Sequence, residues 1–357
     1  MFQITARSAA LPSKRTLSRP TLRDVAERAG VGIATASRAL NEGSISETLR
    51  QRVTAAAEDL GYQPHRLALG LRTGATKTVG FVVSDVANPV LGRTAQGAVS
   101  YLDAAGYAMM LAVSDGYVER ERSLIRMMYE RRADGLILSC SDETDPRLAA
   151  VVSQLDIPVV LLDRELPVPR VHRLIVNHRQ GVMQAVEHLV KLGHRRVAYI
   201  GGPSVVRPCR ERYDAYRAAA ALHGIWDERL VTLGPLTAET GREATINLMT
   251  TSPPPTALIV ADNRRAIGAL RAIHDRGLEV PHDLSLVALS GDVDALALHN
   301  PPITIVDRPL EEMGMEAAKL LLASLAPVDS IDRPVTRTFD GRFVARGSTA
   351  PPSPSTG

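Results

Sequence analysis

The chain has 357 residues and a net charge of +3, and 45% of its residues are hydrophobic and 23% charged. This composition is that of globular domains and the length exceeds one small core, so we expect two or three folded domains and exclude a disordered or fibrous chain. Two cysteines are too few for a disulfide framework, and no apolar run reaches the roughly 18 residues of a membrane span.

Charge is divided unevenly along the chain. Residues 1–77 contain twelve basic and six acidic side chains, so they carry six positive charges, and the rest of the chain carries three negative ones. This asymmetry indicates a polyanionic partner at one end, although a solvated basic face would give the same count. Residues 1–19 lack the apolar core of a secretory signal, and we expect them to be a disordered basic extension of a cytoplasmic protein with no membrane partner.

Three short segments with helical spacing follow this extension. The first begins after Thr21, a typical N-cap residue, and ends at Gly30. A second is predicted over 32–40 and a third over 47–60, where Gly61 is placed to end it. Two helices joined by a tight glycine-containing turn and supported by a third form a helix-turn-helix, which we assign to residues 20–64.

The second helix carries small and polar side chains on the face away from its expected core. Short side chains let a helix enter the major groove, where hydroxyls reach phosphates and arginine forks onto guanine. A merely amphipathic surface helix would show the same pattern, so these residues alone leave both interpretations open. The outward residues are Ile33, Ala34, Thr35, Ser37 and Arg38.

From residue 78 short aliphatic runs alternate with amphipathic segments. Strands that alternate with helices indicate parallel βαβ units, and two such series predict two doubly wound α/β lobes within 78–349. The first series has strands at 79–84, 108–113, 135–139 and 158–163, with helices near 90–105, 119–131 and 146–155. The second has strands at 196–200, 230–233, 257–260 and 284–289, with helices near 179–192, 210–223, 237–250 and 263–276. Segments 303–306 and 337–344 complete the sheets, with a helix over 310–325 between them.

Two connecting parts complete the predicted organisation. Residues 65–77, with a polar, glycine-bearing end, form a linker with room for about two helical turns. Residues 350–357 are rich in proline and serine and are expected to be a disordered tail.

Four stretches of the chain resemble the LacI/GalR family of transcription regulators. They are TLRDVAERAGVGIATASRALN, YQPHRLALGLRTGATKTVGFVV, LGHRRVAYIGGP and FVARGST, and the resemblance spans roughly residues 20–349. It implies a sequence-specific DNA-binding regulator, expected to be a repressor, that binds a pseudo-palindromic operator as a homodimer. It further implies control by a small-molecule effector held between the lobes. The sequence does not decide between dimer and tetramer, or between induction and corepression.

The resemblance also implies roles for residues of the head and linker. By this resemblance, Thr21, Thr35, Ser37 and Asn41 contact the sugar-phosphate backbone of DNA. Ile33, Ala34 and Arg38 contact the edges of the bases. Segment 65–72 matches a hinge helix that enters the minor groove, with His65 at its start, Leu71 as the wedge between bases and Ala68 at the close approach of two hinges. Four residues depart from the family pattern and indicate differently tuned operator binding: Gly32, Leu49, His65 and Gly70.

In the body, polar residues follow the predicted strands at their carboxyl ends, where α/β sheets bind ligands. Ordinary turn chemistry would explain any single one of these residues equally well, but it explains the whole set much less well. The resemblance implies that they bind the effector, a sugar or sugar acid. The candidate effector-binding residues are Ser84, Asn88, Arg93, Asp163, Arg164, Arg210, Asp262 and Asp292.

The effector's class is not fixed by these residues. Val90 and Leu91 stand where the family often has two aromatic side chains, and the segment 290–292 replaces a consecutive pair of aspartates. Stacking on a flat sugar ring is therefore less assured. Four arginines near the expected cleft permit the hypothesis of an anionic ligand: Arg93, Arg164, Arg207 and Arg210.

No motif for catalysis or for a cofactor is visible. The chain lacks a phosphate-binding glycine motif and a nucleophile elbow, and its histidines lack metal-ligand spacing, with His172 and His178 bracketing a short strand. We expect no enzyme activity, cofactor or metal. A transporter-associated solute-binding protein would carry a signal peptide and no basic head, and an enzyme fused to a DNA-binding module would need catalytic groups. A ligand-responsive activator remains an alternative.

Overall fold

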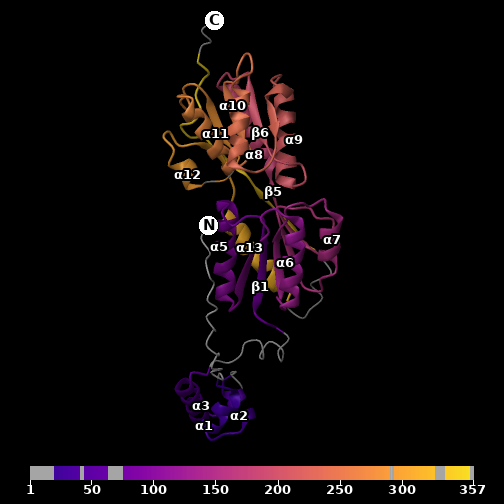
Figure 1. The fold of residues 1–357 in the computed structure, drawn as a ribbon, viewed down its shortest axis with the longest axis vertical. Helices are drawn as coiled ribbons and strands as arrows, with labels where there is room; N and C mark the ends of the chain where they lie inside the picture. Colours follow the sequence, from indigo (N-terminus) through magenta and orange to yellow (C-terminus); the bar gives the residue numbers. More distant parts are fainter. Residues whose placement is uncertain are drawn as a thin grey trace, which may run out of the picture. The chain divides into compact units, whose positions relative to one another are not determined.

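The structure is a computed structural model that describes residues 20–40, 44–62, 75–289, 291, 293–325 and 334–353. The chain divides into two compact units, one up to Thr76 and the other from Lys77 onward (Figure 1). No helix among the described residues is long and apolar enough to cross a lipid bilayer.

The N-terminal unit contains a bundle of three helices, α1 (Leu22–Arg28), α2 (Ile33–Leu40) and α3 (Glu47–Leu60). Thr21 and Asp24 cap the start of α1 reciprocally, since the backbone N–H of each donates to the side chain of the other. Gly61 ends α3 at φ +62°, a conformation that favours glycine. The core is small and aliphatic, with Val25 and Val53 fully buried. The predicted helix-turn-helix is confirmed.

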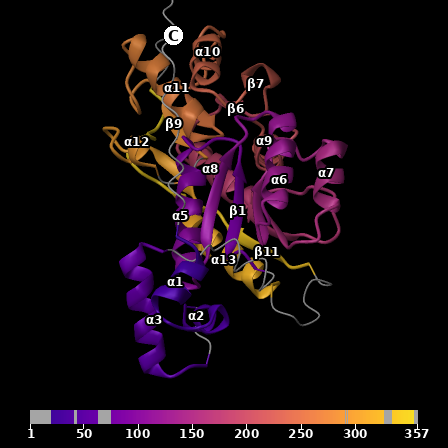
Figure 2. The same ribbon diagram turned by 60° about the horizontal axis from the view of Figure 1, so that its bottom comes forward.

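The first lobe of the C-terminal unit is an α/β layer structure. Its strands are β1 (Thr78–Val83), β2 (Ala108–Val113), β3 (Gly135–Ser139), β4 (Val159–Leu162), β5 (His172–Asn177) and β11 (Thr336–Asp340), and its helices are α5 (Pro89–Ala104), α6 (Val118–Glu130), α7 (Pro146–Ser153) and α13 (Leu310–Ala323). The strands are parallel in the order β11-β5-β4-β3-β1-β2. Helices α5 and α13 pack on one face and α6 and α7 on the other (Figure 2), which buries the central strands on both sides.

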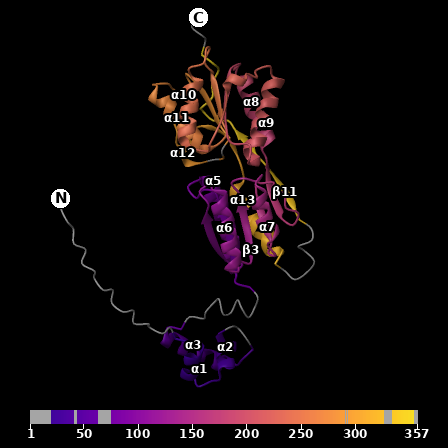
Figure 3. The same ribbon diagram turned by 45° about the vertical axis from the view of Figure 1, so that its right-hand side comes forward.

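The second lobe repeats this plan. Its strands are β6 (Val197–Gly201), β7 (Val231–Leu233), β8 (Ala257–Val260), β9 (Ser285–Ala288), β10 (Thr304–Asp307) and β12 (Arg342–Val344), and its helices are α8 (His178–Lys191), α9 (Arg207–Leu222), α10 (Ala238–Leu248), α11 (Asn263–Asp275) and the short α12 (Asp294–Ala297). The order is β12-β10-β9-β8-β6-β7, with only β12 antiparallel among the described strands. Helices α8 and α9 cover one face, and α10 and α11 cover the other (Figure 3). The two predicted lobes are confirmed.

The described chain passes between the lobes at three points. It crosses from β5 into α8 at His178, from β10 to α13 through Arg308 and Pro309, and from β11 to β12 through Gly341. The segment 337–344, expected to complete the sheets, does so as two strands, one in each sheet. Because three connections join the lobes, their relative motion is restricted to a hinge at these points.

The end of the described chain differs from the expected disordered tail. The backbone N–H of Ala350 donates to Ser285 Oγ at 3.0 Å. The carbonyl oxygen of Ala350 lies 2.9 Å from His194 Nε2. Ser353 Oγ donates to the carbonyl of His282 at 2.9 Å. Residues 350–353 thus pack against the second lobe, and 354–357 lie outside the described residues.

Helices α5 and α13 approach each other through glycines, and this contact generates the first prediction. A methyl group on Gly97 would overlap the backbone carbonyl of Glu311, whereas one on Gly92, also in α5, would meet nothing within 4 Å. We expect Gly97→Ala to lower the free energy of unfolding by about 1–3 kcal/mol, because the added methyl group overpacks the contact. Gly92→Ala should be neutral or raise it by up to about 1 kcal/mol through helix propensity.

Chemical denaturation followed by circular dichroism measures both glycine variants. Equal unfolding midpoints for Gly97→Ala and Gly92→Ala would show that α5 and α13 do not pack through this close backbone contact.

Candidate functional site

The outer face of α2 offers an apolar and cationic surface in the head. Ile33 is 46% exposed, Ala34 and Arg38 are exposed, and Thr35 is half-buried. Arg38 Nε donates to the carbonyl of Ala34 at 3.3 Å, so the guanidinium lies along the helix surface. Ser37 is only 7% exposed, which corrects the prediction that it faces outward. It stands between Ala36 and Ala39 in sequence, both core residues, and its small side chain fits that packed side of the helix.

Arginines of α1 and α3 hold the head together and add positive charge to its surface. Arg50 Nη1 donates to the carbonyl of Ala39 at 3.0 Å and so satisfies the last turn of α2. Arg28 pairs with Asp59 at 3.0 Å, with both side chains largely exposed. The helix that the sequence assigns to DNA is therefore fixed by its neighbours within a rigid bundle.

Several predicted site residues cannot be placed. Asn41 in the head, the hinge residues His65, Ala68 and Leu71, and Asp292 in the body lie outside the described residues. Their assigned roles remain predictions from the sequence.

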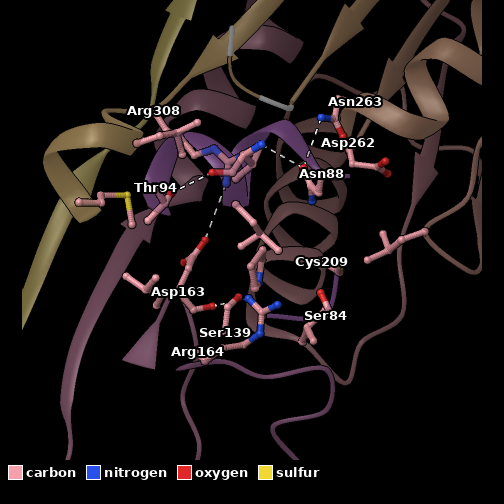
Figure 4. A pocket seen from close by; sticks show the side chains of 18 of the residues that line it. Ser84, Asn88, Thr94, Ser139, Asp163, Arg164, Cys209, Asp262, Asn263 and Arg308 are labelled. Carbon is pink, nitrogen blue, oxygen red and sulfur yellow. Dashed lines mark hydrogen bonds and ion pairs between the residues drawn. The ribbon is translucent and has the colours of Figure 1, made fainter. Parts of the chain in front are cut away.

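A cavity of about 120 Å³ lies at the strand ends where the two lobes of the body meet (Figure 4). It is lined by side chains from both lobes, and Figure 4 shows them converging from several elements. The carboxyl ends of parallel strands supply much of its wall, as the sequence predicted. Five of the eight candidate effector residues line it: Ser84, Asn88, Asp163, Arg164 and Asp262.

A wider space of about 560 Å³ adjoins this cavity and shares part of its wall. Ser84, Asn88, Arg164 and Asp262 border both spaces, so a ligand in one would be within reach of the other. We call the smaller space the inner pocket and the wider one the outer pocket. No aromatic ring borders either pocket among the described residues, and Val90 and Leu91 line the inner one with aliphatic side chains.

Asp163, at the end of β4, connects the two lobes. Its Oδ1 accepts from the backbone N–H of Val176 at 3.1 Å and from Arg207 Nη1 at 3.0 Å, and its Oδ2 lies 2.8 Å from His178 Nε2. Arg308 Nη1 is 3.9 Å from Oδ2. Because β4 belongs to the first lobe, Arg207 to the second, and His178 and Arg308 to the crossing segments, one carboxylate joins all of them.

Burial and charge set the protonation of this cluster. Burial alone would raise the pKa of Asp163, but its contacts with His178, Arg308 and Arg164 hold that pKa well below its usual value. Burial lowers the pKa of His178 to about 3 and so keeps the ring neutral. Nδ1 of this ring accepts from Arg212 Nε at 3.2 Å, which leaves Nε2–H to donate to Asp163. Burial and the nearby Arg212 lower the pKa of Arg308 to about 9.

Three arginines that the sequence associates with the cleft are held by carboxylates and border neither pocket. Arg93 makes a bidentate ion pair with Glu311 of α13 within the first lobe. Its Nε donates to Oε1 at 2.6 Å and its Nη2 donates to Oε2 at 2.9 Å. Arg210 Nη2 donates to the buried carboxylate of Glu143 at 2.7 Å. Arg207 pairs with Asp163, as described above. Arg93 and Arg210 therefore border neither pocket in this structure, and their role in binding the effector stays a prediction from the sequence.

Two arginines that sequence reasoning missed do line the inner pocket, namely Arg212 and Arg308. Arg212 lies one helical turn after Pro208, another lining residue, so helical spacing along 207–212 carried the signal. Arg308 directly follows β10, and the rule that polar residues gather at strand ends could have found it.

Charged and polar pairs also cross the cleft at its opposite side. Arg264 of α11 forms an ion pair with Asp85, which follows β1. Asn263 Nδ2 donates to Asn88 Oδ1 at 3.4 Å, and the same Oδ1 caps α5. Together with the pair of Arg210 and Glu143, these contacts link the lobes on both sides of the pockets.

Both parts of the chain match known families. Residues 21–65 match the bacterial regulatory proteins of the lacI family, and residues 186–349 match the periplasmic binding protein-like domain. The HTH-type transcriptional repressor PurR of Vibrio campbellii is 30% identical over 304 residues, which cover 85% of this chain and 91% of that repressor. PurR of Photobacterium profundum is 29% identical with the same coverage of both chains.

Two solved structures are similar over nearly the whole chain. The lac repressor dimer bound to operator and the anti-inducer ONPF has a TM-score of 0.82 at 26% identity, covering 93% of this chain and 100% of that one. The complex of the transcriptional regulator CelR with cellobiose has a TM-score of 0.70 at 31% identity, covering 92% and 100%.

Acid should destabilise the fold through His178. Its pKa is about 3 in the folded chain against about 6.5 when unfolded, so its contribution to stability is full above pH 6.5 and lost as the pH falls. Between those values the free energy of unfolding should drop by about 1.4 kcal/mol per pH unit for this residue. His172, His188 and His194 also have lowered pKa values and act in the same direction.

Urea unfolding at pH 7.0 and 5.5 measures this pH dependence. His178→Gln, which retains a donor and an acceptor, should show a smaller acid loss than the unaltered chain, and the exposed His282→Gln should not. An identical pH slope in both variants would show that His178 is not held neutral.

Proposed function

This chain belongs to the LacI family of bacterial regulatory proteins, and from that premise we propose that the residues around its inner pocket bind the effector that controls operator binding. The protein is a ligand-responsive, DNA-binding transcriptional repressor. The single observation that carries the proposal is the position of five sequence-predicted residues around one cavity between the lobes: Ser84, Asn88, Asp163, Arg164 and Asp262.

We propose that α2 enters the major groove of the operator. Ile33, Ala34 and Arg38 contact base edges, whereas Thr21 and Thr35 position the head on the sugar-phosphate backbone. The exposure of Ile33, Ala34 and Arg38 supports this assignment, whereas the burial of Ser37 does not support a contact with DNA through its side chain. A homodimer acting in the cytoplasm presents two such heads to the half-sites of a pseudo-palindrome.

We infer that the effector is a small polar metabolite of the size of a single sugar or sugar acid. A cavity of roughly 150 Å³ holds a benzene ring, so the inner pocket of about 120 Å³ would take only part of a sugar, and the rest would lie in the adjoining outer pocket of about 560 Å³. Hydroxyl and amide groups line it together with aliphatic carbon, which suits a ligand with several hydroxyl groups. The solved CelR complex contains a disaccharide, cellobiose, and the outer pocket would have to hold part of a ligand of that length.

The effector acts by changing the relative position of the lobes. Ion pairs and hydrogen bonds cross the cleft on both sides of the pockets, and a bound molecule adds or removes contacts between the same surfaces. Binding of effector and operator must then be coupled reciprocally, because each shifts the affinity for the other by the same factor.

Operator binding by the full chain tests this function. Selection from random double-stranded DNA should yield a pseudo-palindrome, and its affinity should fall steeply with salt because the head neutralises phosphates. A chain that selects no sequence and shows no salt-dependent binding to any duplex would overturn the proposal.

Arg38 provides a sharper measurement on the selected operator. Arg38→Ala should lose about 1–3 kcal/mol of binding free energy and relax preference at one base pair of each half-site. Lys77→Ala removes the same charge but should weaken binding slightly and equally for all sequences. Fluorescence anisotropy with operators altered at single positions distinguishes the two, and an unchanged base preference in Arg38→Ala would exclude its contact with a base.

A further inference from the structure

The wall of the inner pocket carries more positive than negative groups. Three guanidinium groups line it, those of Arg164, Arg212 and Arg308, against two carboxylates, those of Asp163 and Asp262. Charges in a concave wall between two lobes of low dielectric constant are screened less than charges on an open surface, so this excess matters for any ligand that enters.

Both carboxylates are already engaged by cations outside the lining. Asp163 accepts from Arg207 at 3.0 Å, and Arg207 itself does not border the pocket. Asp262 pairs with Arg265 and also accepts from the backbone N–H of Arg265 at 3.0 Å as the N-cap of α11. Each carboxylate therefore has a cationic partner outside the lining, although Arg207 also pairs with Glu165 and Glu211.

The guanidinium group of Arg212 makes its described hydrogen bonds to uncharged groups. Its Nη1 donates to the carbonyl of Ala261 at 2.6 Å, and its Nε donates to the neutral ring of His178. Arg164 likewise donates to the carbonyls of Cys140 and Asp163, at 2.6 and 2.9 Å. Carbonyl dipoles orient these side chains toward the pocket but do not cancel their charge.

The N-termini of four helices meet at the same cavity. The first-turn residues that line it are Val90 of α5, Cys209 of α9, Asn263 of α11 and Leu310 of α13. Each of these helices has 13 residues or more. A helix N-terminus carries a partial positive charge and free backbone N–H groups, so the convergence adds to the potential of the arginines.

Arg265 places a further buried guanidinium group behind the pocket wall. Arg265 is fully buried, and its Nη2 has no hydrogen-bond partner among the described residues. Nη2 lies within 3.0 Å of the point where a Cβ on Gly202 would stand, and so do Cys209 Sγ and Leu236, both of which line the pocket. Arg265 does not itself border the pocket, so this donor lies behind the pocket wall and is not offered to a ligand.

We propose that the inner pocket selects a compact metabolite carrying an anionic oxygen group, a carboxylate or a phosphate ester, held by Arg164 and Arg212. The proposal rests on the proposed function, since it names the chemical class of the same effector. No aromatic ring borders the inner pocket among the described residues, so its described wall offers no surface for ring stacking. Charge-assisted hydrogen bonds replace stacking as the source of selectivity.

Thermal unfolding of the full chain with matched probes tests the charge of the ligand. The carboxylate arm compares D-glucuronate with D-glucose and D-galacturonate with D-galactose, and the phosphate arm uses D-glucose 6-phosphate. Acetate and inorganic phosphate, each compared with chloride at equal ionic strength, test the anionic group alone. At least one acid should raise the unfolding temperature where its neutral counterpart does not, and the arm that responds identifies the group.

Variants connect the effect to the arginines. Calorimetric affinity for the responding acid should fall about tenfold or more in Arg212→Gln, as expected for loss of a charge-assisted hydrogen bond. Arg217→Gln, on the exposed side of the same helix, should leave it unchanged. Arg164→Gln should show the same loss and serves if Arg212→Gln does not fold, because Arg164 is only half-buried.

The possible outcomes separate this proposal from the proposed function. A neutral sugar that stabilises the chain and shifts operator affinity as well as its acid does would overturn the anionic assignment and leave the effector site in place. The anionic assignment would also be overturned if no acid raised the unfolding temperature above that of its control, with acetate and inorganic phosphate counted among the acids. If the unaltered chain bound no double-stranded DNA, that result would instead contradict the proposed function.

Discussion

Asp163 is the group on which the arrangement of the body depends. Its carboxylate is buried, its backbone adopts φ +53°, and it contacts both lobes and two of the segments that cross between them. An unpaired buried charge costs several kcal/mol, so Arg207 and the neutral His178 must keep their positions for the carboxylate to remain there. The left-handed backbone, tolerated by aspartate better than by most residues, is maintained because these contacts over-determine it.

This constraint gives the pocket between the two lobes a fixed wall on one side. The cluster around Asp163 fixes the hinge side of the cleft, while the pairs of Arg210 with Glu143 and Arg264 with Asp85 join the lobes at its edges. The side chains of Arg210 and Arg264 in these pairs are each 36% exposed, so solvent weakens their attraction to Glu143 and Asp85. A ligand therefore needs only a modest difference in affinity between two lobe positions to change their populations.

Arginine has two separate roles in this molecule. Where a carboxylate faces it, as with Arg93 on Glu311, it joins neighbouring helices and contributes no charge to the cleft. Where carbonyls face it, as with Arg212 and Ala261, its charge remains for a ligand. Both kinds lie near the predicted cleft in the sequence, so neither their position nor the family resemblance separated Arg93 and Arg210 from Arg212 and Arg308. Partner choice depends on residues up to 218 positions away in the chain.

The sequence by itself determined the elements and the edge of the sheets at which ligands gather. Helical spacing with Thr21 and Gly61 defines the head, and aliphatic runs followed by Ser84, Asp163 and Asp262 define the pocket wall, because periodicity and strand ends are local properties of the chain. Only the tertiary structure decided that Ser37 is buried and that residues 337–344 divide between two sheets. It alone decided which arginines face the cavity, because long-range packing and pairing set these features.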